Sequence, residues 1–365
     1  MRIADVINSL GERIDSVAGM LGSADFIVFG AGNGGRFAKA CLEGMGKRVA
    51  FFCDNDPKKD GTFIGSTMVL APERLLEQDI PICIASDWAN EIASQLKGMG
   101  IKRYLDLSAM LWHHGGNESA NISARELMSN NMEDIEKAYG MFADEESRRV
   151  FLSVIKYRLT LDPAGLVNAP FKQYYNPHAS LVRNDVIIDG GAWVGDTAIG
   201  FARHLACQCK VFSLEPEKTN YDLLRENIIA SGLEGVVEPV MAGFWSNGCQ
   251  MRFNSDIRYG EGTQYHVDPE GAGEIELVAL DGFARERGIC PTLIKMDIEG
   301  AEVKVIEGSR ETVAERSPRL QISVYHRASD LWEIPLLIKG INPRYKFHLS
   351  HHSNNFSDTV LYACV

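Results

Sequence analysis

A glycine-rich turn follows a strand-like segment in the middle of the chain, in the sequence VIIDGGAWVGDTA at residues 186–198. Asp189, Gly191 and Gly195 form a D-x-G-x-x-x-G pattern, and the next strand-like run, KVFSLE, ends in the acid Glu215. A glycine turn paired with a downstream acid is typical of a site for a ribose-bearing cofactor in an α/β sheet. A carboxylate at that place can accept hydrogen bonds from both ribose hydroxyls.

Ionisable residues also stand at the ends of three later strand-like segments. These residues are Asp297 and Glu299 in IKMDIEG, His326 in SVYH, and the pair His351 and His352. Because ligands bind at the carboxyl ends of the strands in open α/β sheets, we expect these side chains at one edge.

Each part of this pattern also has a simpler structural interpretation. Asp189 could cap the helix after the turn, and Gly190 and Gly191 could only relieve backbone strain. Glu215 could be a surface acid at a helix start. The combination favours a ligand site, because a carboxylate at the end of the second strand can accept hydrogen bonds from both ribose hydroxyls.

The elements that position these residues alternate between strand and helix. From residue 176 the strand candidates are DVIIDG, KVFSL, VVEPVM, TLIKMD, RLQISVYH, YKFHLSHH and DTVLYACV, which predict a complete α/β domain over 176–365. An earlier alternation predicts a smaller parallel sheet in a domain over 1–112. Between them, 113–175 is expected to be a helical connector, since Ser123 and Glu126 have capping-box spacing and Pro163 follows a later helix.

Bulk composition is that of an ordinary globular protein. The chain has 365 residues, 45% of them apolar and 24% charged, so two domains are expected. Its net charge of −12 argues against nucleic acid as the main partner. We expect no membrane span and no signal peptide, because acidic and basic residues interrupt the N-terminal helix, and we therefore expect a cytoplasmic protein.

The C-terminal part resembles the FkbM family of S-adenosylmethionine-dependent methyltransferases. The resemblance rests on six features: DGGAWVGDT, LEPEKTNYDLLREN, ALDGF at 279–283, IKMDIEGAE, the Tyr-His strand end, and a closing HHS…TVLYA hairpin. It covers roughly residues 145–365. It implies a class I methyltransferase fold, a seven-stranded Rossmann-like sheet with its last strand antiparallel, preceded here by the smaller Rossmann-like α/β domain.

The resemblance also implies a cofactor, a reaction and a set of contacts. The cofactor would be S-adenosylmethionine, and the reaction would be O-methylation of a sugar or of a glycan or natural-product precursor, as in glycan biosynthesis. Asp189, Gly191 and Gly195 would line the methionine part, and Glu215 would hold the ribose. Ala242 would flank the adenine. The turn residues Gly190 and Thr197 are also assigned to the cofactor site.

A hydroxyl acceptor has to lose a proton during methyl transfer, and His326 is the candidate general base. Asp297 could orient His326 or the acceptor, and Glu299, His351 and His352 are candidate substrate residues. Asp297, Glu299 and His326 could alternatively bind a divalent metal, with mixed oxygen and imidazole ligands. This metal site is the less favoured interpretation.

A second glycine turn lies near the N-terminus. Gly30, Gly32 and Gly35 fit G-x-G-x-x-G, and Asp54 follows the next strand, which is a dinucleotide-binding pattern. This segment resembles small domains that bind nucleotide-linked sugars. Docking of such a substrate, NAD(P) binding and a purely structural or homo-oligomerising module all stay open. An NAD(P)-dependent oxidoreductase and a non-catalytic nucleotide-binding protein are therefore the alternative functions.

Overall fold

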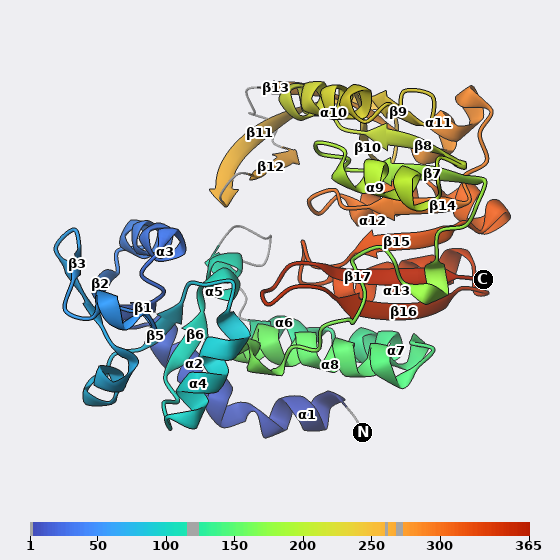
Figure 1. Ribbon diagram of the computed structural model, residues 1–365. Helices are drawn as coiled ribbons and strands as arrows, with labels where there is room; N and C mark the ends of the chain where they lie inside the picture. Colours follow the sequence, from blue (N-terminus) through green and yellow to red (C-terminus); the bar gives the residue numbers. More distant parts are fainter. Residues whose placement is uncertain (1–2, 115–123, 260–261, 268–272) are drawn as a thin grey trace. The chain divides into compact units, whose positions relative to one another are not determined.

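The computed structural model describes residues 3–114, 124–259, 262–267 and 273–365 (Figure 1). The chain folds into two compact units, each made of several segments. The N-terminal unit comprises Met1–Glu136, Arg148–Asn168 and His351–Ser357, and the C-terminal unit comprises Lys137–Ser147, Ala169–Ser350 and Asp358–Val365. The sequence predicts three continuous stretches, 1–112, 113–175 and 176–365, whereas each unit groups segments that are far apart in sequence. The predicted bounds therefore stay a prediction.

In the described part of the chain, the N-terminal unit contains a six-stranded sheet in the order β3-β4-β2-β1-β5-β6. Its strands are β1 (Asp25–Phe29), β2 (Arg48–Cys53), β3 (Phe63–Ile64), β4 (Thr67–Leu70), β5 (Ile82–Ile84) and β6 (Tyr104–Asp106). All neighbouring pairs are parallel except β3 with β4. The small parallel sheet expected from the sequence is therefore present.

The first helices of the chain are α1 (Ile3–Ser9), α2 (Gly11–Leu21), α3 (Asn33–Gly44), α4 (Ala89–Gly98), α5 (Leu107–His114), α6 (Ala124–Asn130), α7 (Met132–Met141) and α8 (Glu145–Thr160), with η1 (Pro57–Lys59), η2 (Pro72–Glu77) and η3 (Pro163–Gly165). The helices from α1 to α8 belong mainly to this unit, although Lys137–Ser147, with the second half of α7 and the start of α8, belong to the C-terminal unit. The first segment forms two consecutive helices, α1 and α2, and the segment that begins at Pro72 is a 3-10 helix. Ser123 of the expected capping box lies outside the described residues.

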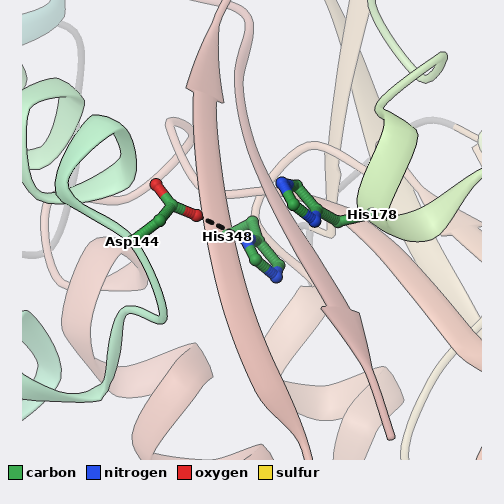
Figure 2. Close-up of side chains that lie close together, drawn as sticks. All are labelled: Asp144, His178 and His348. Atoms are coloured by element: carbon green, nitrogen blue, oxygen red, sulfur yellow. Dashed lines mark hydrogen bonds and ion pairs between the residues drawn. The ribbon is translucent and has the colours of Figure 1, made fainter.

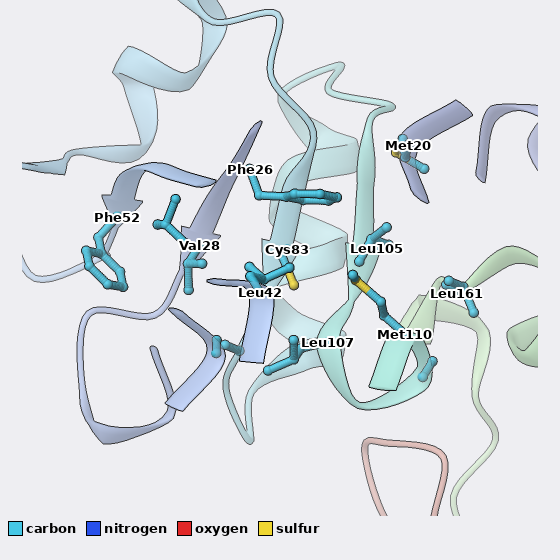
Figure 3. Packing of buried hydrophobic residues seen from close by; sticks show 14 of the residues in the cluster. Met20, Phe26, Val28, Leu42, Phe52, Cys83, Leu105, Leu107, Met110 and Leu161 are labelled. Atoms are coloured by element: carbon cyan, nitrogen blue, oxygen red, sulfur yellow. The ribbon is translucent and has the colours of Figure 1, made fainter. Parts of the chain in front are cut away.

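The N-terminal unit has a buried hydrophobic cluster on each face of its sheet, and the larger one includes residues of α3 and α8. Phe26 and Val28 of β1 pack there with Leu42 of α3 and Leu105 of β6 (Figure 3). Leu161, which follows α8, joins the same core and accepts a backbone hydrogen bond from β6 at 2.9 Å. The α8 segment therefore completes a core built mainly from the first hundred residues.

Among the described residues, the C-terminal unit has a seven-stranded sheet in the order β16-β17-β15-β14-β7-β8-β9. The strands are β7 (Asp185–Gly190), β8 (Cys209–Leu214), β9 (Val237–Val240), β14 (Leu293–Met296), β15 (Arg319–Ser323), β16 (Lys346–His351) and β17 (Thr359–Cys364). All seven expected strands are present, and β17 runs antiparallel to β15 as expected.

The helices of this unit mostly follow the parallel strands. They are α9 (Asp196–His204), α10 (Lys218–Ala230), α11 (Leu280–Arg287), α12 (Glu302–Glu307) and α13 (Asp330–Ile341), with the short turns η4 (Pro177–Ala179) and η5 (Thr312–Arg316). Since α9, α10, α12 and α13 come directly after β7, β8, β14 and β15, their first turns and the preceding loops lie at the carboxyl ends of these strands. Within the described residues, no helix is long and apolar enough to cross a membrane.

A further sheet was not expected from the sequence. It has the order β10-β13-β11-β12 in the residues that the structure describes, with β10 (Gly243–Phe244), β11 (Cys249–Tyr259), β12 (Gly262–Val267) and β13 (Gly273–Val278). β11 pairs antiparallel with both β12 and β13 (Figure 1). Polar residues and glycines are frequent in this segment, so its strands lack the apolar runs that predicted the other sheets.

Candidate active site

The register of the central strands brings the expected site residues to one edge of the C-terminal sheet. Met296 of β14 pairs with Gly190 of β7, and Gly190 pairs with Leu214 of β8. Asp297 directly follows β14, and Glu215 directly follows β8. Because β7 lies between these two strands, the two acids lie on either side of the glycine turn. We call this edge the carboxyl edge.

The glycine turn at the carboxyl edge leaves no space for side chains at two positions. Gly191 has a φ of +71°, and a Cβ there would lie 1.9 Å from the carbonyl oxygen of Asp297. Gly195 has a φ of +90°, and its Cβ would lie 2.7 Å from Leu224. Glycine is required at both positions by backbone conformation and by close approach. The turn therefore presents bare backbone at the end of β7.

A buried ion pair lies beneath the turn. The Lys295 ammonium is 2.9 Å from Asp189, and it donates hydrogen bonds to the carbonyls of Gly190 (3.2 Å) and Gly191 (2.8 Å). Burial alone would lower the pKa of Lys295, but Asp189 and Asp297 outweigh this effect and raise it. Lys295 thus stays charged and fixes the turn. Sequence reasoning missed it, although a lysine inside an apolar strand was a usable signal.

Glu215 is only 4% exposed, and it contacts the glycine turn. Its Oε2 accepts the N–H of Trp193 at 2.9 Å, and its Oε1 accepts the N–H of Glu217 at 3.0 Å. Burial raises the pKa of Glu215 to about 7, although these two donors oppose the rise. A carboxylate has about four lone-pair positions, so it can accept further donors from a ligand.

Asp297 is surrounded by hydroxyls and cations. Its two oxygens accept hydrogen bonds from Tyr174 (2.9 Å) and Tyr325 (3.0 Å), and Nε2 of His326 lies 3.3 Å away. Burial alone would raise the pKa of Asp297, but the charges of His326 and Lys295 lower it below its usual value. Asp297 is therefore ionised and firmly held. The contact of Tyr174 with Asp297 was not expected from the sequence, because Tyr174 comes from a loop far away in sequence.

His326 lies among carboxylates. Its Nδ1 is 2.8 Å from Glu302, and its Nε2 is 3.6 Å from Glu299. Glu302 also accepts the N–H of Ile298 at 3.0 Å, so it holds both the imidazole and the loop after β14. Burial alone would lower the pKa of His326, but Glu302, Glu299 and Asp297 together raise it well above its usual value. The imidazole is therefore cationic at neutral pH.

Two further acids adjoin this cluster, the exposed Glu299 and the buried Asp330. Desolvation raises the pKa of Glu299, whose backbone is left-handed with a φ of +55°. Burial and the charge of Glu302 raise the pKa of Asp330 to about 8. Asp330 accepts the N–H of Arg327 at 2.8 Å, so it shapes the loop that carries His326. Sequence reasoning missed Asp330 and Glu302, since each could equally have been a surface acid of a helix.

The other predicted residues have different positions. Gly190 is the last residue of β7, Thr197 lies in the first turn of α9, and Ala242 is buried between β9 and β10. His351 and His352 fall in the N-terminal unit, whereas His326 belongs to the C-terminal unit. Burial, with the charge of His352, lowers the pKa of His351 to about 4, so its imidazole is neutral.

The N-terminal glycine turn is just as tightly built. Gly30 has a φ of +124°, and a Cβ at Gly35 would lie 1.7 Å from the Gly30 carbonyl oxygen. Gly32 caps the start of α3. Asp54 follows β2 and accepts the N–H of Ala31 at 2.9 Å. The four predicted residues are therefore brought together at one strand edge.

The acids after the second strands of the two sheets make similar contacts. Asp54 accepts one N–H from the turn residue Ala31 and one from Asp56, both at 2.9 Å. Glu215 uses its two oxygens in the same way. Asp54 additionally pairs with Lys59 at 2.7 Å. Both units thus place an acid, fixed by backbone donors, beside a bare glycine turn.

The segment that contains the carboxyl edge matches the model of a known protein family. Residues 189–352 match the family model of the methyltransferase FkbM domain. The matched segment begins at Asp189 and includes Glu215, Asp297 and His326. The match supports a methyltransferase activity for this part of the chain.

Solved structures extend the similarity to the whole fold. The chain is 19% identical to the FkbM methyltransferase from Methylobacillus flagellatus KT, with a TM-score of 0.72, and the alignment covers 99% of this chain and 98% of that one. The similarity shows the fold, and it confirms the expected Rossmann-like α/β class.

More distant structures align with about half of the chain. The putative tRNA (m1A22) methyltransferase Sp1610 of Streptococcus pneumoniae is 12% identical, with a TM-score of 0.33, over 51% of this chain and 65% of that one. Fibrillarin from Aeropyrum pernix, solved with S-adenosyl-L-methionine, is 9% identical, with a TM-score of 0.35, over 53% and 71%. No curated protein matches the chain.

Proposed function

We propose that the C-terminal unit transfers a methyl group from S-adenosylmethionine to a hydroxyl of a sugar, or of a glycan or natural-product precursor. The observation that carries this proposal is the carboxyl edge itself, where a bare glycine turn and buried Glu215 face ionised Asp297 and His326 across β7. The match of residues 189–352 supports the reaction class.

The carboxyl edge fits the proposed cofactor. Glu215 is held by two backbone donors and keeps acceptor positions for ribose hydroxyls. The turn from Asp189 to Gly195 offers bare backbone to the methionine part, with Gly190 and Thr197 beside it. Ala242, small and buried, would flank the adenine. S-adenosylmethionine supplies a methyl group already activated on a sulfonium, so positioning of the acceptor provides much of the catalysis.

His326 would accept the proton of the acceptor hydroxyl. Its Nδ1 is fixed by Glu302 at 2.8 Å, so Nε2 is the nitrogen directed toward Asp297 and Glu299. The imidazole has to lose its own proton before it can act as a base. Because the surrounding carboxylates raise its pKa, His326 can act as a base only under alkaline conditions or when the acceptor displaces one of these carboxylates from the imidazole.

A divalent metal bound by Asp297, Glu299 and His326 is the less favoured alternative. The His326 imidazole is cationic and Lys295 adds a second positive charge beside Asp297, so a metal ion would have to displace or oppose both. Loss of turnover in EDTA and its recovery with Mg²⁺ would support the metal instead.

The N-terminal unit would dock the nucleotide part of a nucleotide-linked sugar. Asp54 makes the same two backbone contacts as Glu215, which supports a second site for a ribose. In this proposal the protein acts in the cytoplasm on a sugar-containing small molecule or glycan precursor, and a homo-oligomer is compatible with it. An NAD(P)-dependent oxidoreductase is not favoured, because the matched segment is of the methyltransferase type.

The proposal is tested by incubating the protein with S-adenosylmethionine and a panel of free and nucleotide-linked sugars. We expect S-adenosylhomocysteine to be released, with a mass gain of one methyl group on an acceptor hydroxyl. His326→Ala should lower turnover about 100- to 10,000-fold, the usual contribution of a general base. NAD(P)H oxidation or formation with the same sugars, without methyl transfer, would contradict the proposal.

A further inference from the structure

A second cluster of ionisable side chains lies away from the carboxyl edge. Asp144, His178 and His348 come from three separate segments: the connection between α7 and α8, the turn η4, and β16 (Figure 2). Their ligand-type atoms all lie within 4.8 Å of one another, and no other described group of three His, Cys, Asp or Glu side chains meets this condition. β16 is the outermost strand in the order of its sheet.

His348 and Asp144 form the inner part of the cluster. Nδ1 of the buried His348 is 2.5 Å from an Asp144 oxygen. The second Asp144 oxygen accepts the N–H of Ser147 at 2.7 Å, which fixes the carboxylate at the start of α8. The N–H of Leu349 in turn donates to the Ser147 hydroxyl at 3.0 Å, so the α7–α8 connection is tied to β16.

His178 approaches from the other side. Its ring is stacked on the His348 ring, with centroids 3.8 Å apart and an angle of 1° between the planes. The N–H of His178 donates to the Asn176 side chain at 2.8 Å, and Asn176 in turn lies 3.3 Å from the hydroxyl of Ser350 in β16. The η4 turn is therefore positioned on the same strand as His348.

The donor atoms in the cluster suit a cation. An Asp144 oxygen and nitrogens of the two stacked imidazoles lie within 4.8 Å of one another, and the N–H of Ser147 holds the carboxylate in place. A metal ion binds imidazole in its neutral form and carboxylate in its ionised form, so one ion would join all three side chains.

We propose that Asp144, His178 and His348 form a binding site for a divalent transition metal such as Zn²⁺. Two imidazole nitrogens and one carboxylate oxygen are a common ligand set for such ions, with bonds of about 2.0–2.2 Å. Metals bind imidazole nitrogen in the plane of the ring, so one of the stacked rings has to turn. The exposed His178 has the freedom to do so.

The metal would act as a structural cross-link. It would join the α7–α8 connection, η4 and β16, which are otherwise held together by the hydrogen bonds described above. Because an ion that binds only the folded chain stabilises it, Zn²⁺ should raise the unfolding midpoint of the protein.

The test compares Zn²⁺ binding to full-length variants after EDTA treatment and dialysis. Equilibrium dialysis gives the bound zinc, and the visible absorption of Co²⁺ reports the ligand geometry. We expect the wild type to bind one more Zn²⁺ per chain than His178→Ala and Asp144→Asn, or to bind it about 10- to 100-fold more tightly. His204→Ala, which removes another exposed histidine, is the matched control and should bind like the wild type.

Glu299→Gln separates this site from the carboxyl edge. Under the proposal it retains the Zn²⁺ and the associated rise in the unfolding midpoint. Zinc lost in Glu299→Gln but retained in His178→Ala would place the ion at the carboxyl edge and overturn the proposal. Equal zinc binding in the wild type, His178→Ala and Asp144→Asn, or no binding in any of them, would overturn it as well.

Discussion

At the scale of single residues, the side chains around His326 set the pH range in which it can accept a proton. Glu302, Glu299 and Asp297 lie within 3.6 Å of its ring nitrogens and hold the imidazole in its charged form. A histidine with a raised pKa stabilises the fold at low pH, and it loses this contribution as the pH rises through the folded-state pKa. As a base, in contrast, the same histidine becomes competent only when it is neutral.

Turnover should therefore rise with pH above neutrality and level off once His326 is deprotonated. Glu302→Gln removes the negative charge closest to Nδ1, so it should lower the pKa of His326 and move the rising limb about 1 to 3 pH units toward acid. The measurement is kcat against pH for each variant. Affinity for S-adenosylhomocysteine should change little, since Glu302 has no assigned cofactor contact.

Glu307→Gln is the matched control for this experiment. Glu307 lies on the same helix, α12, but pairs with Lys304 on the surface, so its removal should leave the pH profile in place. A rising limb at the same pH in Glu302→Gln and Glu307→Gln would exclude His326 as the group that titrates.

At the scale of elements, the turn after β7 depends on glycine at position 191. Its φ of +71° is unfavourable for other residues, and a Cβ would lie 1.9 Å from the Asp297 carbonyl oxygen. The backbone of the turn therefore packs directly against the backbone that follows β14. Any side chain at this position has to separate them.

Gly191→Ala should destabilise the protein by about 2–5 kcal/mol, from left-handed strain of about 1–2 kcal/mol and overpacking of about 1–3 kcal/mol. Gly282→Ala is the control, because Gly282 lies in α11 and a methyl group added there would have no atom within 4 Å. Alanine there should stabilise the helix by about 0.5–1 kcal/mol. Urea unfolding measures both effects, and equal stability of the two variants would contradict this account of the turn.

Much of the C-terminal sheet could be predicted from the sequence, because its buried parallel strands are runs of apolar residues bounded by glycine or acids. The run ending at Asp189 and the one ending at Glu215 are examples. The sheet formed by β10 to β13 could not, since its strands are rich in polar residues. The contact of Tyr174 with Asp297 and that of Glu302 with His326 could not be predicted either. Each forms only when tertiary packing brings together segments that are distant in sequence.

At the scale of the whole molecule, the two units repeat one arrangement: a bare glycine turn with an acid fixed beside it. Only the turn of the C-terminal unit lies in the segment that matches the methyltransferase model. In that unit the edge also carries Asp297 and His326, where we propose that the acceptor binds. We likewise propose that Glu215 binds S-adenosylmethionine and that Asp54 binds a different, nucleotide-linked ligand.

Calorimetric titration of S-adenosylhomocysteine into the wild type, Glu215→Ala and Asp54→Ala tests the central assignment most directly. The account predicts one binding site per chain in the wild type, a large loss of affinity in Glu215→Ala, and unchanged affinity in Asp54→Ala. No binding to the wild type, or binding lost in Asp54→Ala but retained in Glu215→Ala, would contradict it.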